Sequence, residues 1–316
     1  MQRLSLTFGL LLSSSSWILC TDILAGQVQQ VTDESDRASD VLFEIRERIS
    51  KEDALWLVNV DNALANMFLR QSRWRLALGS LDRILELIPA ATKRYVDSNY
   101  SEVGNAAELE QCLAAAFRCE ILSRRGRILL QLGALPEVAN VFESAQNVWI
   151  SISSSSIPTE LTNHRLIKLL PIQMAMNEGL FNFSKGNYDR AMSCFSRALE
   201  LLRADGVPVI KYEVEDWMGP TVAGTETATI VYTECINNMA LCALYTCQMK
   251  EAVQLFEGSI REDAGSFLTE RTVFNLCTLY ELGADSATSS RRKRVLQLIA
   301  KRFFLHDVGP ESFRLN

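Results

Sequence analysis

The stretch KGNYDRAMSCFSRALEL, residues 185–201, decides the fold expected of this chain. A glycine near its start is followed by Tyr188, and small and large apolar residues then alternate at Ala191, Phe195 and Ala198. Residues three and four apart lie on one face of a helix, so this order places small side chains where two helices cross closely. The stretch therefore predicts the turn and the second helix of an antiparallel helix pair.

The same order of residues recurs in three other segments of the chain. They are FLRQSRWRLALGSLDRILELIP (68–89), LQLGALPEVANVFESA (130–145) and MALCALYTCQMKEAVQLFEGSI (239–260). Aligned on the small residue that opens each second helix, the four copies place Ala77, Val138, Ala191 and Ala252 in register, at steps of 61, 53 and 61 residues. Such recurrence indicates stacked helix pairs, none of which buries its apolar face alone.

Each copy carries a small residue on its first helix that we expect to face the small residue of the second helix. These are Ala65, Gly126, Gly179 and Ala240. Larger residues one turn further on are expected to lie between neighbouring pairs: Leu81, Phe142, Phe195 and Phe256. Gly133 and Gly186 are expected to form the tight turns inside their pairs. These features resemble the tetratricopeptide repeat, which implies an all-α solenoid of about five helix pairs wound as a right-handed superhelix.

The boundaries follow from this alignment. Residues 1–50 form a lead-in segment with a helix inside 27–50, residues 51–305 form the solenoid, and residues 306–316 form a tail that we expect to pack loosely as a cap. Polar stretches at 90–107, 151–162 and 204–227 are expected to be loops, with a short helix at most in each. A fifth pair is predicted at 269–282 and 291–304, joined by a loop over 283–290.

Composition excludes several classes of function. The net charge is −6, and the one basic cluster, Arg291–Arg294, is interpreted as a solvated helix start, not as a nucleic-acid site. The eight cysteines form no CxxC pair and only two histidines are present, so we expect no metal site and buried free thiols. No nucleotide-binding or hydrolase motif occurs, so we expect neither catalytic residues nor a cofactor.

The amino-terminal sequence favours entry into the secretory pathway. MQRLSLTFGLLLSSSSWILC has one arginine, a short apolar run and four serines, which is the pattern of a secretory signal peptide. Glycosylation sequons begin at Asn99 and Asn182. A lumenal or secreted repeat protein is therefore one alternative, and a ragged start of an incomplete gene model is another.

Asparagines on two first helices are the candidate partner-binding residues. Asn59, Asn62, Asn66 and Arg70 share one helix face, and Asn237 and Asn238 occupy the corresponding turn of the fourth pair. Asparagine is a poor helix former, so several on one face invite an explanation. They would bind the backbone or terminal carboxylate of an extended peptide, or they would bridge to a neighbouring helix.

Several segments carry a more specific resemblance. VNVDNALANMFLRQ (58–71), FNLCTLYEL (274–282), INNMALCALYTCQMKEAVQLFEGSI (236–260) and the closing ESFRLN resemble the carboxy-terminal repeats of subunit 12 of the trafficking protein particle (TRAPP) complex. The resemblance covers residues 58–316, with fewer repeats than this family usually carries. It implies a non-enzymatic accessory subunit of a vesicle-tethering complex that acts in transport from endoplasmic reticulum to Golgi and in autophagy.

The resemblance also implies partners and a location. Subunits 8 and 11 would be neighbours, a Rab GTPase would be linked only indirectly, and the protein would be cytoplasmic, peripheral to Golgi and ER–Golgi intermediate membranes. Such a scaffold is expected to expose apolar patches on its end repeats, where other subunits continue the stack. A free-standing peptide-binding adaptor, for instance a co-chaperone, is the alternative function.

Overall fold

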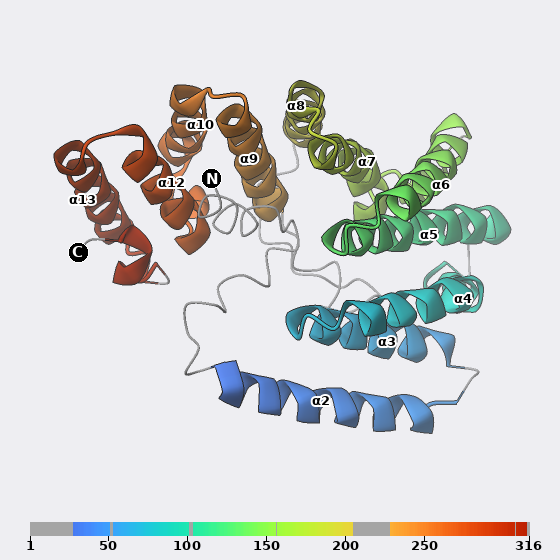
Figure 1. Ribbon diagram of the computed structural model, residues 1–316. Coiled ribbons are helices and arrows are strands. Elements are labelled where there is room, and N and C mark those ends of the chain that lie inside the picture. The colour runs from blue at the N-terminus through green and yellow to red at the C-terminus, as the bar shows by residue number, and fades with distance from the viewer. Residues whose placement is uncertain are drawn as a thin grey trace. The chain divides into compact units, whose positions relative to one another are not determined.

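Helices make up all the regular structure in the described part of the chain. The computed structural model describes residues 28–50, 53–100, 104–155, 157–204, 228–306 and 308–314, and no strand occurs among them (Figure 1). The signal-like amino terminus lies outside these residues, as does the loop expected at 204–227 except for Ala204, which ends a helix. The α-helices are α2 (Val28–Arg48), α3 (Ala54–Arg70), α4 (Trp74–Asn99), α5 (Ala106–Gln131), α6 (Leu135–Ser154), α7 (Arg165–Ser184), α8 (Tyr188–Ala204), α9 (Ala228–Tyr245), α10 (Met249–Glu262), α11 (Ala264–Phe267), α12 (Glu270–Gly283) and α13 (Ser286–Arg302), with 3₁₀ turns η1 (Thr159–Leu161) and η2 (Pro310–Phe313).

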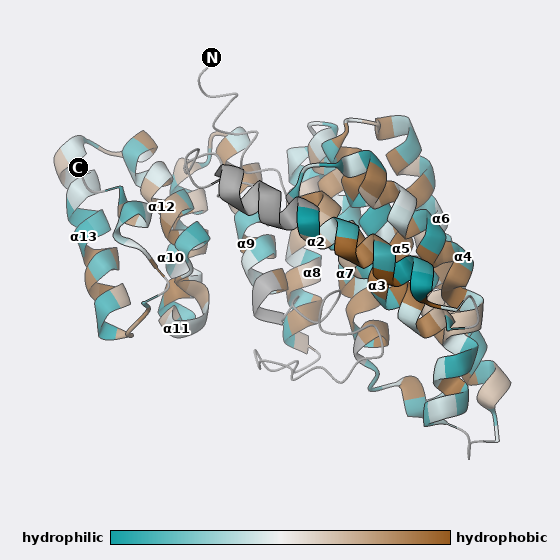
Figure 2. Ribbon diagram, turned by 90° about the horizontal axis from the view of Figure 1, so that it is seen from below, coloured by the Kyte–Doolittle hydropathy of each residue, from teal (hydrophilic) through white to brown (hydrophobic). Residues whose placement is uncertain are grey.

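These helices follow one another as antiparallel pairs, which confirms the predicted fold class. The pairs are α3/α4, α5/α6, α7/α8, α9/α10 and α12/α13. The chain divides into two compact units, with the boundary between Asn177 and Glu178 inside α7. In the first unit α2 packs on α3, and α4 on α5; in the second α8 packs on α9, and α10 on α12. Apolar and polar residues alternate along the helices, as expected where one side of each is buried (Figure 2).

The turns inside the first four pairs share one backbone conformation. Gly133 and Gly186 have φ of 70° and 78°, as their expected role in tight turns requires, and Ser72 and Cys247 take the same left-handed conformation with φ of 56° and 62°. In each turn the next residue donates its N–H to a carbonyl five residues earlier, which is the hydrogen bond of a Schellman motif. The first helices of these four pairs are thus closed in the same way, whether or not glycine stands at the turn.

The glycines of the first helices make room for aromatic rings. A Cβ at Gly126 would lie 2.2 Å from Cε1 of Phe142, and a Cβ at Gly179 would lie 2.5 Å from Cε1 of Phe195. We expected these rings between neighbouring pairs, but each lies against the glycine of its own pair. The two helices of a pair approach closely because each ring packs directly on the backbone at the glycine. Any side chain at the glycine would occupy the position of the ring.

The remaining residues of the repeat pattern lie in the core. Side chains at the crossing and wedge positions are almost or wholly inaccessible: Ala65, Ala77, Leu81, Val138, Ala191, Phe195, Ala198, Ala240, Ala252 and Phe256. Burial of this set on successive helices explains why the order small, large, small recurs in the sequence.

Two expected loops are helical instead. Helix α4 continues past Pro89 to Asn99, because the proline is exposed while Ile88, Ala91 and Val96 carry the buried stripe onward. The loop expected at 283–290 is shorter than predicted, because α13 already begins at Ser286. The Asp285 side chain caps this helix by accepting the Thr288 N–H. At 151–162 the helix α6 runs to Ser154, and η1 supplies the short helix that we allowed there.

The carboxy-terminal tail packs tightly, so the expectation of a loose cap is wrong. Phe313 on η2 is 2% exposed, and η2 contacts both α12 and α13. The Lys293 ammonium donates to the Arg314 carbonyl at 3.0 Å and also pairs with Glu281. Lys293 is therefore a buried anchor for the tail, which corrects the interpretation of the whole basic cluster as a solvated helix start.

Candidate partner-binding surfaces

The asparagine face of α3 meets the neighbouring pair. Nη1 of Arg124 on α5 donates to Asn62 Oδ1 at 2.9 Å, and Nη2 donates to Asn66 Oδ1 at 3.0 Å. Asn62 is fully buried, and Asn59 and Asn66 are half-buried. Arg70 ends α3, and its side chain lies outside the described part. One guanidinium thus binds two asparagines that lie one helical turn apart. These asparagines therefore bridge to a neighbouring helix, which is one of the two roles expected for them.

The fourth pair repeats this arrangement with different residues. Asn275 of α12 donates its amide to Asn237 Oδ1 on α9 at 2.5 Å. Asn238 is buried beside it on α9. In both units an asparagine of one first helix therefore bonds the first helix of the next pair, α3 to α5 and α9 to α12. Three of the six candidate residues, Asn62, Asn66 and Asn237, use their side-chain oxygens to join neighbouring pairs.

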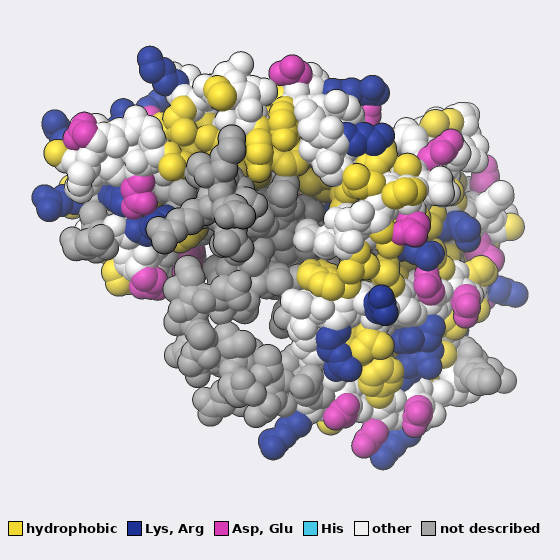
Figure 3. Space-filling model, viewed as in Figure 1, with side chains coloured by type: hydrophobic (Ala, Val, Ile, Leu, Met, Phe, Trp, Pro, Cys, Tyr) yellow, Lys and Arg dark blue, Asp and Glu magenta, His cyan; other side chains and the backbone are white. Residues whose placement is uncertain are grey.

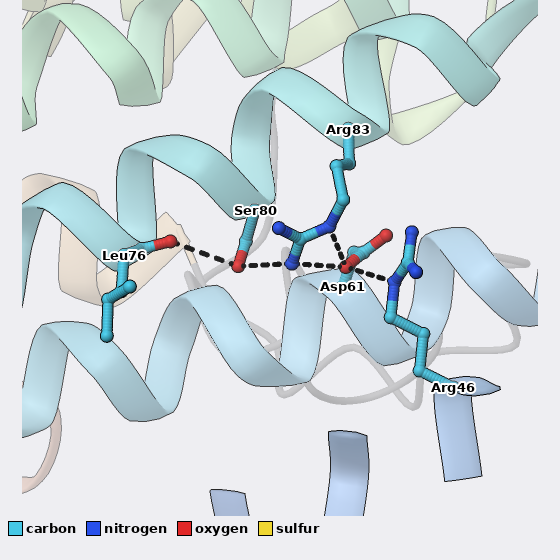
Figure 4. A network of polar contacts seen from close by, with 5 residues as sticks. All are labelled: Arg46, Asp61, Leu76, Ser80 and Arg83. Carbon is cyan, nitrogen blue, oxygen red and sulfur yellow. Dashed lines mark hydrogen bonds and ion pairs between the residues drawn. The ribbon is translucent and has the colours of Figure 1, made fainter. Parts of the chain in front are cut away.

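A buried carboxylate that the sequence analysis missed joins three helices. Asp61 of α3 is fully buried, and its Oδ1 accepts from Arg46 Nε of α2 at 2.9 Å and from Arg83 Nε of α4 at 2.8 Å (Figure 4). Arg83 Nη2 lies 2.7 Å from the same oxygen and donates to Ser80 Oγ at 3.0 Å. The lead-in helix is therefore fixed to the first pair by charge. The sequence does contain a signal for this site, because an aspartate lies within the largely apolar segment 57–69. An acidic residue on a buried helix face requires a partner.

Most of the described thiols are buried, as expected, whereas Cys247 is exposed and Cys112 half-buried. Burial raises the pKa of the Cys119 and Cys242 thiols to about 12 and that of Cys277 to about 11, so these thiols stay protonated and unreactive. Within the described ranges, no group of three His, Cys, Asp or Glu side chains could hold a metal ion. The same part of the chain contains no helix with the length and apolarity to cross a bilayer.

The outer face of α13 is apolar and basic. Val295 is 50% exposed and Leu298 65%, and Phe303 and Phe304 after the helix are 49% and 76% exposed. The helix has six basic residues and no acidic one. Lys and Arg side chains gather at the edge of Figure 3 where Figure 1 places α13. The exposed face of α13 therefore combines large apolar side chains with positive charge.

The lead-in helix α2 also exposes apolar side chains. On α2, Val41 and Ile45 are one turn apart and exposed, and on α3 Trp56 is 66% exposed. The face of α2 that meets α3 carries Phe43, whose ring lies 5.8 Å from that of Phe68. Helices α2 and α13 thus both carry large apolar side chains in contact with solvent.

No protein-family model matches the chain, but two curated proteins do. Trafficking protein particle complex subunit 12 of Mus musculus is 24% identical over 267 residues, which cover 84% of this chain and 27% of that protein. The same subunit of Homo sapiens is 23% identical over 261 residues, 82% of this chain and 28% of that protein. The chain therefore spans little more than a quarter of the length of these relatives, and over most of its own length it is distantly similar to subunit 12 of the trafficking protein particle complex.

Proposed function

We propose that this protein is a non-enzymatic scaffold subunit of a TRAPP vesicle-tethering complex, acting in transport from the endoplasmic reticulum to the Golgi and in autophagy. The observation that carries the proposal is the similarity to subunit 12 across 84% of the chain. The repeated antiparallel helix pairs of the described part are consistent with a scaffold role.

Exposed apolar side chains support a role in assembly. Val295 and Leu298 on α13, and Val41 and Ile45 on α2, are in contact with solvent. Exposed apolar patches mark protein interfaces. In the proposal, subunits 8 and 11 are the neighbours, the Rab GTPase is reached only through the complex, and the protein is cytoplasmic and peripheral to Golgi membranes.

A transport assay tests the proposed function. Cells depleted of the protein receive a secretory cargo that is held in the endoplasmic reticulum and released synchronously, and the time of its arrival at the Golgi is measured. The proposal predicts delayed arrival, restored by re-expression of the chain. Normal arrival after complete depletion would contradict the trafficking role, and a lumenal, processed form of the protein would contradict the cytoplasmic location.

A further inference from the structure

The outer face of α13 has a regular composition along its length. The buried residues Ser289, Lys293, Leu296 and Ala300 follow spacings of four, three and four residues. Two positions further along, the same spacing gives Arg291, Val295, Leu298 and Arg302, all exposed. Positions two apart on a helix are about 200° apart, so this second set points away from the fold. The outward stripe therefore has two apolar residues at its centre and an arginine at each end.

The charges on this stripe are uncompensated within the described residues. Arg292 lies over the Tyr280 ring at 5.2 Å and Lys293 pairs with Glu281, so both are used inside the fold. The other four basic residues of the helix have no ion-pair partner in the described part of the chain: Arg291, Arg294, Lys301 and Arg302. A chain with net charge −6 thus gathers, on one helix face, positive charge that has no ion-pair partner among the described residues.

The end of α13 adds an exposed aromatic residue. Phe304 is 76% exposed and takes φ of 54°, a left-handed conformation that is unfavourable for a non-glycine residue. Its backbone is held there by the bond from the Leu305 N–H to the Ala300 carbonyl. Aromatic and arginine side chains are the residues enriched at the energetic centre of protein interfaces.

We propose that this face of α13 binds an acidic amphipathic helix of another subunit. The proposal rests on the proposed function only in taking the occupant from the same complex. Arg291 and Arg302 are eleven residues apart, or about 16 Å along the helix. The partner helix is therefore expected to carry carboxylates about eleven residues apart, with apolar side chains between them that pack on Val295 and Leu298.

Two other occupants fit this face less well. A second copy in two-fold symmetry would place Arg291 of one chain against Arg302 of its partner, which brings like charges together. A membrane would have to accept Arg291 and Arg302 on the same stripe as Val295 and Leu298, whereas interfacial helices keep basic residues on their polar face. An acidic helix satisfies both the charge and the apolar centre.

Photocrosslinking tests the proposal directly. A benzophenone amino acid is placed at Leu298, and in a control chain at Leu132, which is also exposed but lies at the end of α5. After irradiation in cells, the crosslinked segment is identified by mass spectrometry. The proposal predicts that the Leu298 probe captures a helical segment with net negative charge and the stated spacing, and that the Leu132 probe does not.

Charge reversal supplies the second measurement. The double variant Arg291→Glu, Arg302→Glu is expected to lower the crosslink yield about tenfold or more while circular dichroism stays unchanged. Capture of a second copy, a lipid or a segment without acidic residues would overturn the proposal, as would no capture or no loss on charge reversal. Binding of the chain to vesicles with 30% phosphatidylserine, abolished by the double variant, would also overturn it in favour of a membrane.

The outcomes also separate this proposal from the proposed function. If TRAPP subunits co-purify equally with the wild type and the double variant, the α13 proposal fails and the proposed function stands. If the probe captures an acidic helix from a protein outside that complex, and no TRAPP subunit co-purifies, the docking face stands and the proposed function fails.

Discussion

Replacing Gly179 with alanine measures how closely the helices of a pair pack. The new Cβ would lie 2.5, 2.7 and 2.9 Å from three carbons of the Phe195 ring, which is fully buried and has no open side. Alanine alone would stabilise a helix by about 1 kcal/mol relative to glycine. Overpacking in a dense core costs about 1–3 kcal/mol, and three contacts below 3 Å place this site at the upper end of that range. After the helix gain is subtracted, we expect Gly179→Ala to lower the free energy of unfolding by about 1–2 kcal/mol.

The assay is urea denaturation followed by circular dichroism, with two matched variants. Gly258 lies within α10 and a Cβ there would meet nothing within 4 Å, so Gly258→Ala should raise stability slightly. Combining Gly179→Ala with Phe195→Leu should cost at least about 1 kcal/mol less than the sum of the single changes, because the smaller side chain vacates the site. If Gly179→Ala stabilises the protein as Gly258→Ala does, the packing argument is refuted.

Three further predictions address other parts of the fold. Asp61→Ala removes the carboxylate shared by two partly exposed arginines, so we expect the free energy of unfolding to fall by about 2 kcal/mol and proteolysis within α2 to become faster. Unchanged digestion of α2 would contradict the role of Asp61 in holding this helix. Burial and the hydrogen bond to a glutamate raise the pKa of Tyr232 to about 12, so between pH 10 and 12 the unfolded state loses this proton first and the free energy of unfolding falls as pH rises. Tyr232→Phe should flatten this fall, and an unchanged slope would contradict the raised pKa. Phe313→Ala should lower the free energy of unfolding by about 3–4 kcal/mol and speed amide hydrogen exchange in the tail. A nearly unchanged free energy of unfolding would mean that the tail is not part of the core.

The sequence was sufficient for the helix pairs because their determinants are local. Tyr188, Ala191, Phe195 and Ala198 lie within three turns of one helix, and Gly186 marks the turn that precedes it. The equivalent turn at Cys247 could not be recognised from its residue, since there the surrounding helices impose a left-handed conformation on a non-glycine. The helix beyond Pro89 was missed for a related reason, because burial against neighbouring helices outweighs the local propensity to stop.

The candidate site could be predicted less well than the fold. The pattern placed Asn62 and Asn66 on one face of α3, but Arg124, 58 residues beyond Asn66, decides that this face is bonded. Lys293 was grouped with its basic neighbours because its buried partner, the Arg314 carbonyl, belongs to the tail. Pairings between distant residues depend on how the pairs stack, and spacing within one helix carries no information about them.

Purification of the tagged protein from its own cells, with quantitative mass spectrometry, tests the central claim most directly. The account predicts recovery of several TRAPP subunits at abundance close to that of the tagged chain, since a scaffold subunit is present in fixed proportion. Recovery of chaperones alone, or of lumenal glycoproteins with a processed amino terminus, would contradict it and leave only the helical-pair fold.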